Sequence, residues 1–149
     1  MSKSTADNMQ SISSNAVADA ISVKNVEHQV GYWLGIPMYE KIVSVPIENY
    51  TGTFISKTID TGVTGIVTVI EFGGVFIKGE WNTPTWVMNV PYTYVDTAGT
   101  GKFLMIYCFW DKASNRFSAT LGGTYSNGYY SNGRLYIKFR YIKTTTPVT

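Results

Sequence analysis

The sequence has few of the residues on which metal and thiol chemistry depends. Among 149 residues there is one cysteine, Cys108, and one histidine, His28. A single cysteine excludes an internal disulfide, and so few nitrogen and sulfur ligands argue against a zinc or redox site. We therefore expect no metal and no cofactor, and we interpret Cys108 as a small core residue.

Charge is also scarce, at 15% of residues against about 25% in an average globular protein. Twelve Lys and Arg against ten Asp and Glu leave a formal charge of +2, too weak to favour nucleic acid as a partner. Apolar residues still make up 44% of the chain, which is enough for a core. The length suits one domain with a short appendage.

Long apolar runs are missing. No segment approaches the roughly 20 apolar residues of a membrane-spanning helix, and the N-terminus lacks the apolar region of a signal peptide. We expect no membrane insertion and no secretory leader. This fits a cytosolic product, a virion component assembled inside a host cell, or a fragment expressed without its leader.

Residues 1–28 are expected to form an N-terminal stalk, since the first 25 contain no aromatic residue and no glycine. Ser13 or Ser14 fits the N-cap of a helix near residues 14–22. Apolar residues follow at helical spacing, as in a narrow coiled-coil seam: Met9, Ile12, Ala16, Ala20 and Val23. So short a helix is marginal alone, so it needs its own domain or copies of itself from other subunits.

Residues 29–149 are predicted to fold as an all-β domain, because short runs of β-branched and aromatic residues alternate with glycine-containing turns. Eight strands suit an antiparallel β-sandwich of jelly-roll type. They are expected at 39–45, 53–59, 66–72, 75–80, 85–90, 102–110, 116–121 and 135–142. The last alternates apolar with polar residues, so one of its faces should be buried. Gly73-Gly74 predicts a two-residue hairpin.

Three segments carry recurring patterns. Residues 30–43 contain a G-x-W-x-x-G-x-P-(apolar)-Y-x-K pattern, matched at Gly31, Trp33, Gly35, Pro37, Tyr39 and Lys41. Residues 137–146 are similar to a closing I-x-Y-x-K-T-T strand, and residues 11–21 are similar to an S-S-N-A-V-x-x-A-I helix. Taken together and in their order along the chain, these three segments resemble the C-terminal receptor-binding domains of bacteriophage tail fibres. Residues 47–130 match no pattern of that family.

The resemblance implies a homotrimeric, β-rich fibre tip that attaches the virion to a bacterial surface polysaccharide or other host receptor. It also implies contact with other tail fibre or baseplate proteins, and residence in the virion after assembly in the host cytoplasm. It brings no catalytic residues. Apart from the family, Gly31, Gly35 and Pro37 indicate a structural junction, with Trp33 as an anchor between the stalk helix and the sandwich.

The loop at residues 122–133 repeats Ser-Asn-Gly among three tyrosines. Tyrosine rings stack on sugar faces, and amide side chains hydrogen-bond sugar hydroxyls. The predicted glycan contacts are Tyr125, Asn127, Tyr129, Tyr130 and Asn132. An equally open interpretation is that the two Asn-Gly pairs are hairpin turns, while the tyrosines pack on the sheet or along a trimer axis.

A second aromatic group is interpreted mainly as core or interface packing: Trp81, Trp86, Tyr92 and Tyr94. No catalytic motif is present, and Glu71 and Glu80 are a glycosidase pair only if they meet across the predicted hairpin. We therefore expect binding without turnover rather than an enzyme. The alternatives are a purely structural trimerisation or tail-tip element, and a carbohydrate-binding module of a secreted enzyme.

Overall fold

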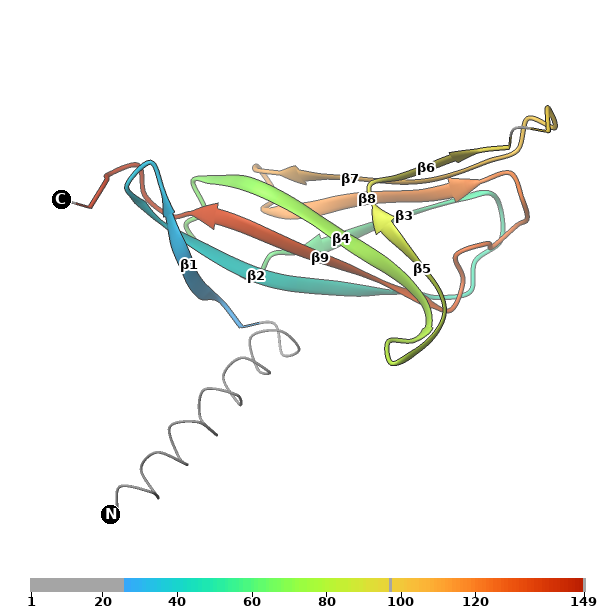
Figure 1. The fold of residues 1–149 in the computed structure, drawn as a ribbon, viewed down its shortest axis with the longest axis horizontal. Coiled ribbons are helices and arrows are strands. Elements are labelled where there is room, and N and C mark those ends of the chain that lie inside the picture. Colours follow the sequence, from blue (N-terminus) through green and yellow to red (C-terminus); the bar gives the residue numbers. More distant parts are fainter. Residues whose placement is uncertain (1–25, 97, 149) are drawn as a thin grey trace, which may run out of the picture.

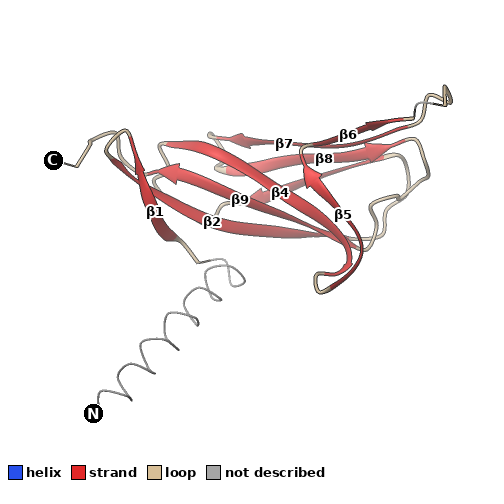
Figure 2. Cartoon of the chain, in the orientation of Figure 1, coloured by secondary structure: helices blue, strands red, loops and turns tan. Residues whose placement is uncertain are grey.

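The computed structural model describes residues 26–96 and 98–148, and within them the chain is all-β (Figures 1 and 2). Nine strands are present there: β1 His28–Trp33, β2 Ile36–Ile47, β3 Phe54–Asp60, β4 Thr68–Glu80, β5 Thr83–Val90, β6 Tyr92–Val95, β7 Phe103–Asp111, β8 Arg116–Gly123 and β9 Gly133–Ile142. They form a five-stranded sheet in the order β1-β2-β9-β4-β5 and a four-stranded sheet in the order β3-β8-β7-β6.

All strand pairs are antiparallel, so the all-β, antiparallel prediction is confirmed. The stalk helix expected near residues 14–22 lies outside the described residues. The described residues contain no apolar helix of the length needed to span a membrane.

The core lies between the two sheets. The ring of Phe117 on β8 lies 5.2 Å from that of Phe72 on β4 and 4.9 Å from that of Phe139 on β9, measured between ring centroids. Burying each such ring contributes roughly 1.5 to 3 kcal/mol. Cys108 is buried on the inner face of β7, as expected, and burial raises the pKa of its thiol to about 12, which makes it a poor nucleophile.

Strand β9 alternates as its sequence predicts. The side chains of Leu135, Ile137, Phe139 and Tyr141 have no exposed surface, whereas Lys138 between them is exposed. The strand lies between β2 and β4 in the five-stranded sheet. Its polar residues therefore line the outer face of that sheet.

The predicted hairpin at Gly73-Gly74 is wrong, because β4 runs straight through both glycines. A β-carbon on Gly74 would lie 1.9 Å from the carbonyl oxygen of Tyr136, so the residue must be glycine where the neighbouring strand passes. The chain turns instead at Trp81 and Asn82, where Glu80 pairs with Thr83. Two predicted strands are thus one, and Glu71 and Glu80 lie about 30 Å apart along it.

Strands β1 and β6 were not expected from the sequence. β1 forms a hairpin with β2 in which Leu34 and Gly35 both have positive φ, 50° and 78°. The predicted need for glycine at position 35 is therefore confirmed. Trp33 is 43% exposed beside this turn, and the stalk that it was expected to contact lies outside the described residues.

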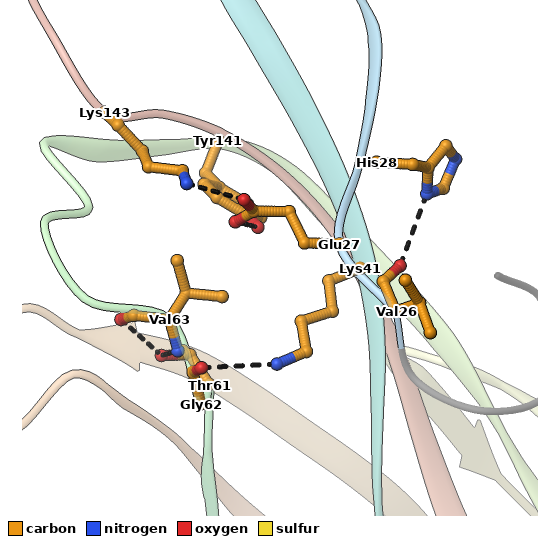
Figure 3. Close-up of polar contacts among 9 residues, drawn as sticks. All are labelled: Val26, Glu27, His28, Lys41, Thr61, Gly62, Val63, Tyr141 and Lys143. Atoms are coloured by element: carbon orange, nitrogen blue, oxygen red, sulfur yellow. Dashed lines mark hydrogen bonds and ion pairs between the residues drawn. The ribbon is translucent and has the colours of Figure 1, made fainter.

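Polar contacts tie the beginning of the described chain to the sheets (Figure 3). The carboxylate of Glu27 accepts hydrogen bonds from the hydroxyl of Tyr141 and, at 2.5 Å, from the ammonium of Lys143. Partial burial raises the pKa of Glu27, but these bonds outweigh that effect and hold the pKa below its ordinary value. Glu27 and His28 therefore belong to the sheet domain, which begins before the predicted boundary at residue 29.

Candidate functional site

The predicted tyrosine loop connects β8 to β9, and its central ring lies inside the protein. Tyr130 has no exposed surface, and its ring centroid lies 5.1 Å from that of Phe76. Its hydroxyl donates a hydrogen bond to the carbonyl of Met105 at 3.3 Å, and its amide donates to the hydroxyl of Tyr50 at 3.1 Å. The prediction that Tyr130 contacts a glycan is wrong, because its ring belongs to the core.

The other loop residues lie nearer the surface. Tyr129 is half-buried against Trp86, with 5.2 Å between ring centroids, and Tyr125 lies 6.1 Å from Tyr129. Asn127 and Asn132 are exposed. Asn132 has a φ of 63° in the turn that leads into β9, and its amide donates to the carbonyl of Ile47 at 2.8 Å; it is a turn residue of the loop over residues 124–132 rather than part of a two-residue hairpin.

A groove with a volume of about 850 Å³ lies on the outer face of the five-stranded sheet. It runs over the central strands β2, β9 and β4, which Figure 1 shows side by side, and it ends at the turn between β4 and β5. The lining residues are Ile42, Val43, Ser44, Glu71, Phe72, Gly73, Gly74, Val75, Ile77, Trp81, Arg134, Tyr136, Lys138 and Arg140.

The polar wall of the groove comes mostly from β9. Arg134, Tyr136, Lys138 and Arg140 alternate with the buried residues of this strand, so they all lie on its outer face. The apolar part comes from the neighbouring strands, through Ile42 on β2 and Val75 and Ile77 on β4. One face of β9 thus builds the core while the other builds the groove.

Ion pairs neutralise one end of the groove. The guanidinium of Arg140 lies 2.8 Å from the carboxylate of Glu40 and 3.5 Å from that of Glu71. The hydrogen bond to Glu40 raises the pKa of Arg140 above its ordinary value. Both carboxylates thus share one guanidinium as their ion-pair partner.

Two further cations of β9 in the groove have no acidic partners among the described residues. Arg134 donates a hydrogen bond from Nη1 to the hydroxyl of Ser44 at 2.9 Å and forms no ion pair there. Lys138 is exposed and likewise has no described acidic neighbour within ion-pair distance. The positive charges at these two positions are therefore not paired with a described carboxylate.

Gly73 forms part of the groove floor. It pairs with Lys138 of β9, on the outer face of the sheet, and its φ lies outside the left-handed region. A β-carbon there would meet only the carbonyl oxygen of Val90, at an ordinary contact distance of 3.7 Å. The missing side chain deepens the groove at a position where other residues fit sterically.

The second aromatic group does not act as a unit. Trp86 packs inside, its ring 5.4 Å from that of Phe76 between centroids, which agrees with the core interpretation. Trp81 is 68% exposed in the two-residue turn at the groove's end. Sequence reasoning missed this difference, although a large apolar residue between two strands is a usable signal, because turns are normally polar.

The outer face of the four-stranded sheet is a second unusual surface. Phe54 on β3 and Tyr107 and Phe109 on β7 are 44% to 53% exposed. Hydroxyl residues lie between them, with Ser56 paired to Thr120 and Thr58 paired to Ser118. This face is aromatic and rich in hydroxyl groups, with Asp60, Arg116 and Asp111 paired across one end, whereas the groove combines aromatic residues with cations.

Among the described residues no group of three or more His, Cys, Asp or Glu is placed to hold a metal ion. Comparison with protein-family models, with curated proteins and with solved structures found no match for the chain. The chemistry of the two surfaces therefore carries the functional interpretation, together with the resemblance of the terminal segments.

Proposed function

We propose that this chain is the receptor-binding tip of a phage tail fibre and that it holds a bacterial surface glycan without turnover. The observation that carries the proposal is the groove in which Trp81 and Tyr136 accompany hydrogen-bonding side chains. Exposed rings stack on the apolar faces of sugars, and fixed polar groups orient sugar hydroxyls. The three terminal patterns that resemble tail fibre domains support the phage assignment.

In this proposal the contact surface is the groove rather than the tyrosine loop. Ser44, Arg134 and Lys138 supply hydroxyl, guanidinium and ammonium donors beside the ring of Tyr136. Tyr125, Asn127 and Asn132 act outside the groove, as secondary contacts or turn residues. The finer architecture that we propose is a jelly-roll-like sandwich on a stalk helix, assembled as a homotrimer.

Three copies raise the avidity of a shallow site. If the groove of each subunit reaches the same bacterial surface, effective concentration increases overall binding by about 10² to 10⁴ over one site. A weak single-site contact is then sufficient for attachment.

Substitution of the groove tryptophan tests the proposal. Fluorescently labelled intact chain is expected to stain one or more strains of a bacterial panel, and Trp81→Ala is expected to lower that staining at least about tenfold. Tyr32→Ala is the matched control, since Tyr32 is also an exposed aromatic residue but lies outside the groove. Equal staining by both variants, or release of sugar from the bound glycan, would contradict a non-catalytic groove site.

The second candidate function is a purely structural trimerisation element, favoured by the aromatic face of the four-stranded sheet. This face carries few charges and many hydroxyls, so a second copy of the chain is its natural occupant. Staining of no bacterial strain, combined with a trimeric mass that Tyr107→Lys abolishes, would favour this candidate.

A further inference from the structure

The groove carries two cations on one strand with a tyrosine between them. Arg134, Tyr136 and Lys138 point from the same face of β9. Since a strand rises about 3.4 Å per residue, Arg134 and Lys138 lie about 14 Å apart along it. A ligand that meets both cations must therefore be extended, with a flat unit over Tyr136 in the middle.

The charges of the groove are uneven along its length. At the Arg140 end, Glu40 and Glu71 already satisfy the guanidinium. Further along β9, Lys138 and Arg134 have no acidic partner among the described residues, and the exposed ring of Trp81 lies beyond Arg134, in the turn that follows Glu80. The ring of Tyr136 thus lies between two cations without described acidic partners, and the ring of Trp81 lies on the Arg134 side of the groove.

We propose that the groove binds an acidic polysaccharide, whose carboxylate or phosphate groups meet Arg134 and Lys138 while its sugar rings lie on Tyr136 and Trp81. This inference rests on the proposed glycan-binding function and names the ligand class of the same site. A guanidinium presents a planar fork that fits carboxylate and phosphate oxygens, and an ammonium adds a second point charge.

Single-stranded nucleic acid also combines anions with flat rings, but the groove suits it less well. Such sites need a positive channel that follows a phosphate at every nucleotide. Here only two cations lack described acidic partners, and the exposed carboxylate of Glu71 lies in the same groove. An acidic glycan, whose charges can be spaced by neutral sugars, fits this sparse pattern.

The test uses the intact chain and a panel of immobilised polymers, with binding measured by biolayer interferometry. Alginate and hyaluronan present carboxylates, a teichoic acid presents phosphates, dextran and pullulan are neutral, and a mixed-sequence single-stranded DNA represents nucleic acid. We expect at least one acidic polysaccharide to bind at least about tenfold more tightly than the neutral ones. The carboxylate and phosphate arms show which anion is preferred.

Matched variants connect binding to the groove. The double variant Arg134→Gln, Lys138→Gln is expected to lose at least about tenfold in affinity for the acidic polysaccharide and to keep its affinity for any neutral one. The control Lys112→Gln, Arg116→Gln removes the same charge from the turn and strand of the other sheet and is expected to change neither. Trp81→Ala is expected to weaken the binding of acidic and neutral polysaccharides alike.

The outcomes separate the two proposals. If only neutral polysaccharides bind, or if the groove and control double variants lose the same affinity, the proposal of an acidic ligand is overturned while glycan binding itself stands. Tightest binding to DNA overturns the ligand class. Failure of every polysaccharide in the panel overturns glycan binding itself.

Discussion

The backbone of Gly74 passes so close to that of Tyr136 that a β-carbon on Gly74 would lie 1.9 Å from the Tyr136 carbonyl oxygen. The next glycine, Gly73, has no such neighbour and opens into the groove. Adjacent residues of the same type therefore have different reasons to be glycine. One is required by the packing of β4 on β9, and the other deepens a surface.

This difference predicts opposite results for two neighbouring substitutions. Gly73→Val should fold with stability within about 1 kcal/mol of the parent chain, because valine suits a strand and meets no clash. Gly74→Val should lose about 3 kcal/mol or more, or fail to fold. Denaturant unfolding of both variants measures this, and similar stabilities would mean that the two positions are wrongly assigned.

The same pair tests the groove. A folded Gly73→Val variant is expected to bind the acidic polysaccharide at least about tenfold more weakly than the parent, because its side chain occupies the floor. Unchanged binding by this variant would place the ligand elsewhere on the molecule.

Tyr130 is predicted to matter for stability rather than for binding. Truncation by Tyr130→Ala should cost about 3 to 5 kcal/mol, as for other large buried rings. Tyr130→Phe removes only the hydrogen bond to Met105 and should cost about 1 kcal/mol. Thermal unfolding is the measurement, with Asn127→Ala as the exposed control from the same loop, and a Tyr130→Ala transition close to the parent's would contradict the buried placement.

Glu27 is predicted to make stability fall at acid pH. Its folded pKa is lowered, so below its unfolded pKa of about 4.3 the unfolded state binds more protons and stability decreases as pH falls through the folded pKa. Glu27→Gln should reduce the loss of unfolding free energy at acid pH, the acid limb, in unfolding curves measured between pH 7 and pH 2. An acid limb identical to the parent's would show that the contacts with Tyr141 and Lys143 add no stability.

The solution mass tests the proposed trimer. Light scattering of the intact chain at micromolar concentration is expected to report a mass near three times 16.6 kDa. A chain that begins at Val26 keeps every contact of Glu27 and shows whether the preceding residues are required. Monomers in both cases would favour a detached carbohydrate-binding module over a fibre tip.

The sequence by itself determined the all-β class, the buried face of β9 and the place of Cys108 in the core. These follow from local periodicity and side-chain chemistry, because apolar residues at every second position of a strand must share one face. The turn at Gly35 is of the same kind, since its backbone conformation depends on the residue itself.

Only the tertiary structure decided which aromatic residues are available to a ligand. Tyr130 and Trp81 belong to equally aromatic segments, yet one lies against Phe76 in the core and the other is exposed in a turn. The prediction of a hairpin at Gly73-Gly74 was wrong for the same reason, because the close approach to Tyr136 comes from a strand far along the chain. The groove likewise needs β2, β9 and β4 side by side, and that order is set by long-range pairing that local pattern does not encode.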